Sequence, residues 1–232
     1  MNRSLVTALA LCGVVAASAS AVAAPTLSFR FYEDGVLQAA SSTSTSGTLS
    51  VNTSSSRFSV VGGFATGIPV IAAPSMTVQT TTISSLSTFG SGPSTIRLEY
   101  TQTEVPSASA GGLLAQLAST MGANLLVNGE LIDFVTISNY ANADGAAFGT
   151  TTLLAQSTFT NTGASASGII IGNAVLPNSL FSETVVISVR VLGAGAGINA
   201  NSQIVAVPEP ATIGLFGMAL LGLGMLRRRE SV

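Results

Sequence analysis

The chain has 232 residues and a net charge of −2 from 8 Arg and 10 Asp or Glu, and it contains no Lys, His or Trp. Charged residues make up 8% of it, against about a quarter in an average soluble domain. The few arginines exclude nucleic acid as a partner, since phosphate binding draws on clustered Lys and Arg.

The N-terminus has the features of a secretory signal peptide. A basic residue precedes an apolar run at residues 5–17, and Ala21 and Ala23 then form a small-residue cleavage pattern. We expect residues 1–23 to be removed, which leaves Ala24 at the new N-terminus. A cut one residue later is disfavoured because a proline would follow the scissile bond. The alternative is an uncleaved anchor, but the apolar run is shorter than the ~20 residues of a spanning helix.

Residues 24–206 are expected to form the exported domain. The single cysteine, Cys12, leaves with the signal, so the mature domain has neither a disulfide nor a thiolate metal site. Short segments with alternating apolar residues, rich in Thr and Val and separated by turn residues, predict β-strands. These segments are 26–31, 48–51, 57–61, 75–81, 95–103, 125–127, 134–140, 153–160, 183–192 and 203–207. Their spacing predicts an all-β fold, an antiparallel β-sandwich.

Three stretches between these segments need separate treatment. Residues 111–121 fit both a helical and a period-two pattern, so we allow one short helix there. The Asn128-Gly129 pair lies between two apolar triplets and predicts a tight hairpin, because both residues tolerate positive φ. Residues 39–46 are a low-complexity Ser/Thr tract, which favours a solvated loop over the alternative of an O-glycosylation site.

The residue inventory limits the catalytic chemistry of the exported domain. Without His, Lys or Cys it cannot build Ser-His-Asp, Ser-Lys, Cys-His or His-ligated metal sites. A glycosidase needs two facing carboxylates, and the candidates are Glu99, Glu104, Glu130 and Asp133. Asp144 is an alternative Ca²⁺ ligand, although one acid in a turn is more typical of a bond to the backbone. We expect no catalytic residue, cofactor or metal.

The C-terminal segment carries the most specific pattern of the sequence. Its uncharged apolar stretch, 211–226, would rise about 24 Å as a helix, slightly short of a ~30 Å hydrocarbon core that can thin locally. Arginines favour the cytoplasmic side of a membrane, and prolines before the stretch keep the preceding peptide extended. The order of these features is Pro208, Glu209 and Pro210, then residues 211–226, then Arg227, Arg228 and Arg229. The alternative is an ordinary tail anchor.

This triplet, Gly-interrupted apolar stretch and Arg cluster resemble the PEP-CTERM sorting signal of Gram-negative bacteria, over residues 207–230. The resemblance implies that Pro208, Glu209 and Pro210 form the recognition motif, that 211–226 is a single transmembrane helix and that the three arginines form the cytoplasmic stop. It also implies processing by the membrane protease exosortase, followed by release to the cell surface or extracellular matrix. Members of this family are associated with exopolysaccharide and biofilm.

The sequence therefore predicts an exported structural or interaction protein of the surface or matrix, with exosortase, the membrane and extracellular polysaccharide as partners. The first alternative is a carbohydrate-binding β-sandwich module. Sugar platforms usually present aromatic faces, and this chain offers only Tyr32, Tyr100 and Tyr140 besides phenylalanine. The second alternative is an enzyme that acts on matrix glycan through a carboxylate pair.

Overall fold

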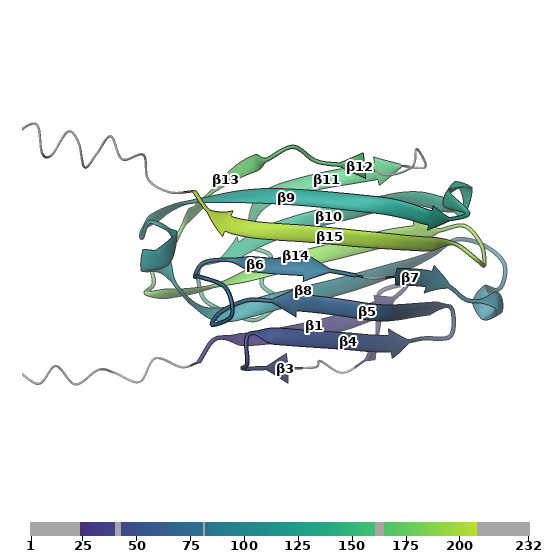
Figure 1. Ribbon diagram of the computed structural model, residues 1–232, viewed down its shortest axis with the longest axis horizontal. Coiled ribbons are helices and arrows are strands. Elements are labelled where there is room, and N and C mark those ends of the chain that lie inside the picture. Colours follow the sequence, from purple (N-terminus) through teal and green to yellow (C-terminus); the bar gives the residue numbers. More distant parts are fainter. Residues whose placement is uncertain (1–23, 40–42, 81, 161–164, 208–232) are drawn as a thin grey trace, which may run out of the picture.

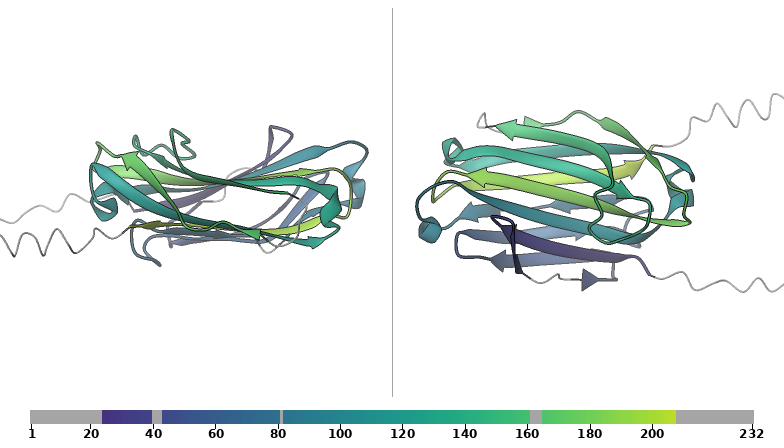
Figure 2. Two further views of the ribbon diagram at one scale, coloured as in Figure 1. Left: turned by 90° about the horizontal axis from the view of Figure 1, so that it is seen from above. Right: turned by 180° about the vertical axis from the view of Figure 1, so that it is seen from behind.

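The computed structural model describes residues 24–39, 43–80, 82–160 and 165–207. Within these ranges the chain forms two antiparallel β-sheets that pack face to face, and Figure 2 shows the two layers edge-on. The predicted antiparallel β-sandwich is confirmed. The helical elements of the described residues are three short 3₁₀ segments, at Ser87–Phe89, Ser107–Ala110 and Gly129–Leu131.

One sheet has seven strands in the order β11-β10-β14-β8-β1-β2, with β3 beside β1. They are β1 (Thr26–Glu33), β2 (Val36–Ala39), β3 (Thr43–Ser44), β8 (Ser94–Pro106), β10 (Ile132–Asn142), β11 (Thr152–Thr160) and β14 (Leu180–Val191). The other sheet has eight strands, with β12, β9, β15, β6, β5 and β4 in order and β13 and β7 alongside (Figure 1). They are β4 (Thr48–Ser54), β5 (Phe58–Thr66), β6 (Met76–Gln79), β7 (Thr82–Ser85), β9 (Leu114–Val127), β12 (Ser165–Ala166), β13 (Ile170–Val175) and β15 (Gly197–Ala206).

The core lies between the sheets and follows from the alternation of apolar residues along each strand. In β1, Leu27, Phe29 and Phe31 are at most 1% exposed, while the residues between them point outward. Phe29 packs on Tyr100 of β8 with 4.9 Å between ring centroids. The charges are unevenly shared, because the strands of the eight-stranded sheet contain no charged residue within the described ranges.

Both ends of the described chain lie at one end of the sandwich. Residue 26 pairs with Thr103 near the end of β8, and Ala206 pairs with Leu117 near the start of β9, which follows β8 after a short connection. In Figure 1 both ends of the coloured ribbon leave at the left. We call this the terminal end; it comprises residues 24–25, 67–75, 107–113, 143–151, 176–179 and 207. The opposite, distal end comprises residues 34–35, 55–57, 86–93, 128–131 and 192–196.

The short helix allowed at residues 111–121 is wrong, because most of this stretch belongs to β9. Its small and apolar residues Ala115, Leu117 and Met121 face the core at period two. A helix would use its backbone groups internally and could not form the ladder in which β9 pairs with β15 along ten positions. Tertiary pairing therefore overrides an ambiguous local pattern.

The hairpin predicted at Asn128-Gly129 is also wrong. Asn128 does adopt the left-handed conformation, with φ 48° and ψ 51°. However, the segment before it, β9, lies in the eight-stranded sheet, and the segment after it, β10, lies in the seven-stranded sheet. The turn thus carries the chain across the sandwich instead of joining neighbouring strands.

Several predicted features lie outside the described residues. These are the signal peptide at 1–23 with Ala21 and Ala23, the triplet at 208–210, the apolar stretch at 211–226 and the arginines at 227–229. Ala24 is the first described residue and is exposed. Among the residues that the structure describes, no helix is long and apolar enough to cross a membrane.

Candidate functional site: the outer face of the seven-stranded sheet

The outer face of the seven-stranded sheet presents two rows of mostly polar side chains that run across five strands. The right-hand view of Figure 2 looks onto this face. The rows arise because successive side chains of a strand point to opposite faces of the sheet, so these residues alternate with the inward-facing ones. The first row is Tyr32, Arg97, Ser188, Thr136 and Thr158, and the second is Arg30, Glu99, Val186, Ser138 and Gln156. Glu99, Val186 and Ser138 are at most 7% exposed, so the accessible part of this face is the first row together with Arg30 and Gln156.

Ionic and aromatic contacts order the β1 and β8 side of this face. Arg97 forms an ion pair with Glu99, and its guanidinium lies 5.7 Å from the ring centroid of Tyr32. Arg30 stacks on the ring of Phe148 at 3.9 Å. Each aromatic ring therefore has a cation on one face, which fixes its orientation.

Hydroxyl and amide groups continue the face toward β11. The Thr136 and Thr158 hydroxyls lie 3.1 Å apart, and the Gln156 amide donates to Ser138 at 3.0 Å. Phe134 and Tyr140 are half-buried on the same side of β10. A surface that combines aromatic rings, hydroxyls, an amide and an ion pair suits a ligand with many hydroxyl groups and some apolar surface.

The loop at residues 143–151 borders this face at the terminal end. Asp144 accepts a hydrogen bond from the Ala146 backbone at 2.8 Å, as expected for an acid in a turn. The Ser182 hydroxyl of β14 donates to the Ala146 carbonyl at 2.7 Å. The loop is thus held over the sheet and supplies Phe148, whose φ of 59° marks a constrained backbone.

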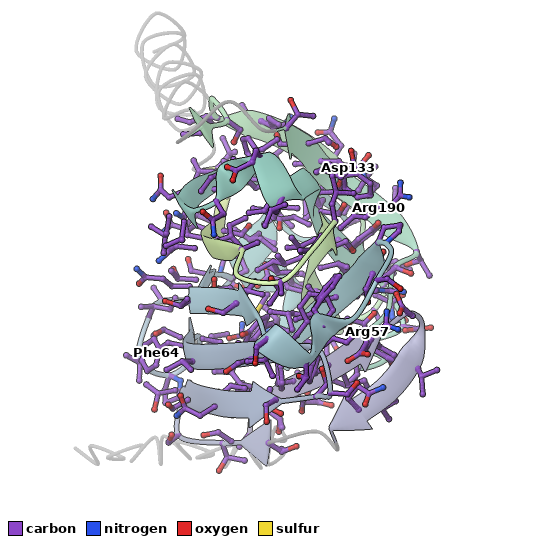
Figure 3. The ribbon with its side chains drawn as sticks, turned by 90° about the vertical axis from the view of Figure 1, so that its right-hand side faces the viewer. Arg57, Phe64, Asp133 and Arg190 are labelled. Carbon is purple, nitrogen blue, oxygen red and sulfur yellow. The ribbon has the colours of Figure 1, made fainter. Side chains whose placement is uncertain are left out.

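The four candidate carboxylates do not converge on one point. Glu99 and Glu104 are five residues apart in β8, which separates their backbones by roughly 16 Å. Asp133 lies near the distal end, where it pairs with Arg190 at 3.0 Å (Figure 3). Glu130 lies in the neighbouring 3₁₀ segment. Within the described residues no group of three or more acidic, His or Cys side chains is placed to hold a metal.

The interior of the sandwich contains a second group of polar residues. The side chains of Tyr100, Gln102, Ser119, Asn139 and Glu183 are fully buried, and each has a polar atom without a hydrogen-bond partner. Burial raises the pKa of the Glu183 carboxyl well above its usual value. Burial likewise raises the pKa of the Tyr100 phenol. A protonated Glu183 is therefore the form that this interior favours.

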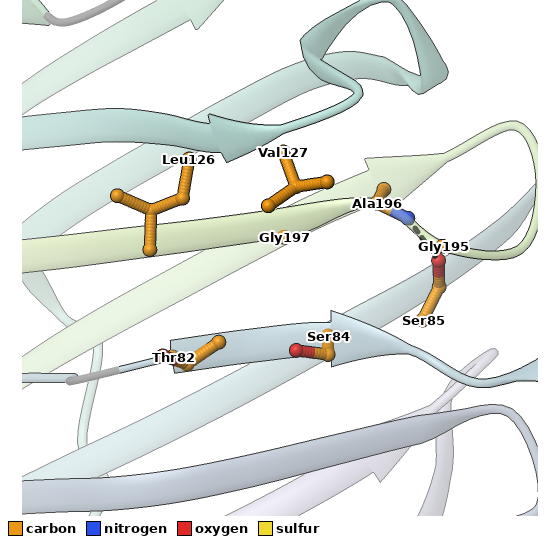
Figure 4. Close-up of a pocket in the computed structure, with 8 residues that line it drawn as sticks. All are labelled: Thr82, Ser84, Ser85, Leu126, Val127, Gly195, Ala196 and Gly197. Atoms are coloured by element: carbon orange, nitrogen blue, oxygen red, sulfur yellow. Dashed lines mark hydrogen bonds between the residues drawn. The ribbon is translucent and has the colours of Figure 1, made fainter.

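A hollow of about 400 Å³ lies toward the distal end of the eight-stranded sheet. Figure 4 shows its lining, which includes Thr82, Ser84, Leu126 and Val127. The Ser85 hydroxyl accepts a hydrogen bond from the Ala196 backbone at 2.9 Å. None of the described residues that line the hollow is charged, so they include no general acid or base.

Comparison with protein families assigns the C-terminal segment. The model of the PEP-CTERM protein-sorting motif matches residues 206–229. The chain carries a PEP-CTERM sorting motif. It implies an exported protein that is sorted through exosortase. No curated protein matches the chain.

The PEP-CTERM motif begins where the sandwich ends, since Ala206 is the last residue of β15. It contains Pro208, Glu209, Pro210 and the three arginines. The roles of these residues, and the signal cleavage at Ala21 and Ala23, stay predictions.

Sequence reasoning had missed the outer face, although strand parity could have located it. Tyr32 alternates with the buried Phe31 and so points outward, whereas Tyr100 shares the parity of the buried Leu98 and points inward. Strand alternation could not have located Phe148, because this residue lies in a loop.

Proposed function

We propose that this chain is a non-catalytic structural or interaction protein of the cell surface or extracellular matrix, where it associates with exopolysaccharide. The observation that carries the proposal is the PEP-CTERM motif that directly follows a complete β-sandwich. Two further observations favour a non-catalytic role, because glycoside hydrolysis needs two facing carboxyl groups. Glu99 and Glu104 are separated along β8, and Asp133, the candidate nearest to Glu130 in the chain, is held by Arg190 at 3.0 Å.

One observation favours a second candidate, a carbohydrate-binding module. Two of the three tyrosines, Tyr32 and Tyr140, lie on the same outer face as Phe148, and the third is buried. Aromatic rings pack on the C–H faces of sugars, while neighbouring Arg and Gln side chains bond to hydroxyls. In this proposal the outer face of the seven-stranded sheet is the glycan-binding surface.

Co-sedimentation of the secreted protein with purified matrix polysaccharide tests both candidates. Tyr32→Ala alters the outer face of the seven-stranded sheet. Gln203→Ala changes an exposed residue of the eight-stranded sheet and is the control. Sedimentation of the wild type and the control but not of Tyr32→Ala supports the binding module. Sedimentation of all three supports matrix association without that face, and failure of the wild type contradicts association altogether. Release of sugars from the polysaccharide would replace both candidates with an enzyme.

The sorting route has a separate test, mass spectrometry of the extracellular protein. We expect it to lack residues 211–229 in a host with exosortase. Glu209→Ala should leave membrane insertion intact and impair processing, because the apolar stretch is unchanged. A secreted form that retains residues 211–229 contradicts the route.

A further inference from the structure

The sandwich ends very close to the segment that is expected to enter the membrane. The Val207 backbone amide donates to the Gln116 carbonyl of β9 at 3.0 Å, so the chain is held on the sheet up to this residue. The apolar stretch begins at residue 211. Four extended residues span at most about 14 Å, which keeps the terminal end of the sandwich near the membrane surface.

The N-terminal side of the domain leads to the same place. Ala24 follows the expected signal peptide and lies at the terminal end together with Val207. A signal with its N-terminus in the cytoplasm and a C-terminal span at 211–226 followed by cytoplasmic arginines would both emerge on the outer side of the membrane. The fold therefore lets both connections reach one membrane face without crossing the domain.

The terminal end exposes aliphatic side chains where the chain leaves. Leu113, Leu114 and Val175 are 59%, 73% and 59% exposed. They are neighbours, because Leu114 pairs with Val175 and the Leu176 amide donates to the Leu113 carbonyl at 2.8 Å. Val70, in the loop at 67–75, is 55% exposed.

The two ends of the sandwich differ in charge. The terminal-end loops at 67–75, 107–113 and 176–179 contain no charged residue, and the loop at 143–151 contains one, Asp144. Asp34, Arg57 and Glu130 lie in the distal-end loops. Bringing the terminal end to a bilayer thus desolvates little charge, whereas the distal end would have to bury several.

We propose that, before its C-terminus is processed, the domain stands end-on against the outer leaflet, with Leu113, Leu114 and Val175 at the lipid headgroup level. The inference rests on the sorting route proposed above, because the span at 211–226 holds the domain there. The short connection makes the contact intramolecular, so weak aliphatic insertion suffices. Processing removes the span and frees this patch.

Tryptophan fluorescence tests the contact, since the chain has no native Trp. The full chain is reconstituted into phosphatidylethanolamine and phosphatidylglycerol vesicles as single-Trp variants. Leu114→Trp should show blue-shifted emission, and brominated lipids should quench most of that emission. Leu113→Trp is a second reporter with the same expected result. Leu192→Trp at the distal end is the matched control, with 44% exposure, and should keep the emission of a water-exposed indole.

A third reporter separates this inference from the route on which it rests. Phe216→Trp lies in the apolar stretch and should be quenched whenever that stretch is inserted. Quenching of Phe216→Trp without quenching at 113 or 114 overturns the inference and leaves the route standing. Failure of Phe216→Trp to be quenched contradicts the route itself. A blue shift at 114 that requires exosortase in the vesicles also overturns the inference, because the partner is then a protein.

Discussion

Glu183 lies directly opposite Gln102 in the register of β14 and β8, and both side chains are fully buried between the sheets. Gln102 uses its carbonyl oxygen to accept from the Ile68 amide at 2.9 Å, which leaves its amide nitrogen unpaired. Tyr100 is the only other titratable residue among the inward-facing side chains of β8 and β10, and the facing sheet has no charged residue in its described strands. No cation is therefore placed to stabilise an ionised Glu183.

We expect the free energy of unfolding of the wild type to fall as pH rises from about 5 to 7. The pKa of Glu183 is raised in the folded state, so above the pKa of an unfolded carboxyl, ~4.3, the folded protein holds a proton that the unfolded chain has lost. Stability then decreases by up to ~1.4 kcal/mol per pH unit until the folded pKa is reached. Glu183→Gln removes this dependence and should stabilise the protein at pH 7.

Urea denaturation of both proteins at several pH values measures the effect. The difference between Glu183→Gln and the wild type should grow with pH, while Glu130→Gln, at an exposed site, should show no such growth. A difference that stays constant between pH 5 and 7 would mean that Glu183 is already ionised in the fold.

Arg57 joins two acidic residues at the distal end. Its guanidinium lies 3.6 Å from the Glu33 carboxylate and 3.3 Å from that of Asp34. Figure 3 labels Arg57. The Glu33 side chain is only 9% exposed, so Arg57→Ala should destabilise the fold by about 1–3 kcal/mol. Thermal or urea unfolding measures the loss. Arg190→Ala is the comparison, because both members of its pair with Asp133 are over 40% exposed, and it should lose less than about 1 kcal/mol. Equal losses would contradict this assignment.

Gly172 of β13 lies where the edges of the two sheets meet. A Cβ at this position would overlap backbone atoms of Leu154 in β11, and backbone cannot rotate away as a side chain can. Gly172→Ala should therefore lower the free energy of unfolding by about 1–3 kcal/mol. Gly168→Ala has nothing within 4 Å of the added carbon and should change stability by no more than about 0.5 kcal/mol. Similar denaturation midpoints for both variants would refute the close approach.

Replacing Arg227, Arg228 and Arg229 together with serine should weaken membrane retention. Each arginine costs ~2.5–3.5 kcal/mol at the bilayer centre on insertion scales, so the three together stop the chain from passing through. Cell fractionation and mass spectrometry should then find extracellular protein with an intact C-terminus. Retention equal to that of the wild type would show that the apolar stretch alone holds the chain.

The sequence predicted strands well where apolar alternation is strong, as in β1 with Leu27, Phe29 and Phe31. It missed β2, β3, β7, β12 and β13, because such short strands bury too few residues to show a pattern. Residues 111–121 were misassigned because leucine and alanine suit both periods, and only pairing with β15 decides between them. The hairpin at Asn128 failed for another reason. The left-handed conformation of Asn128 was predicted correctly. The local sequence, however, does not determine which sheet contains the next strand, β10.

The candidate site depended even more on tertiary structure. The sorting motif is a linear pattern and was found without a fold. The outer face is built from residues that are far apart in the chain, such as Tyr32, Arg97 and Thr136, and only the register of β1, β8, β14 and β10 aligns them. The fully buried Glu183 also ran against expectation, since carboxylates rarely occur inside a core without a partner.

The place of β15 in its sheet determines when the domain can finish folding. This strand is the last of the described chain, yet it lies between β9 and β6. Until residues 197–206 have crossed the membrane, β9 and β6 have no partner at their facing edges, and exposed edges invite aggregation. Export of the domain must therefore be almost complete before the eight-stranded sheet can form fully. On the proposed sorting route, the arginines at 227–229, which follow Ala206 by 21 residues, would hold the chain at the membrane at the moment when this closure becomes possible.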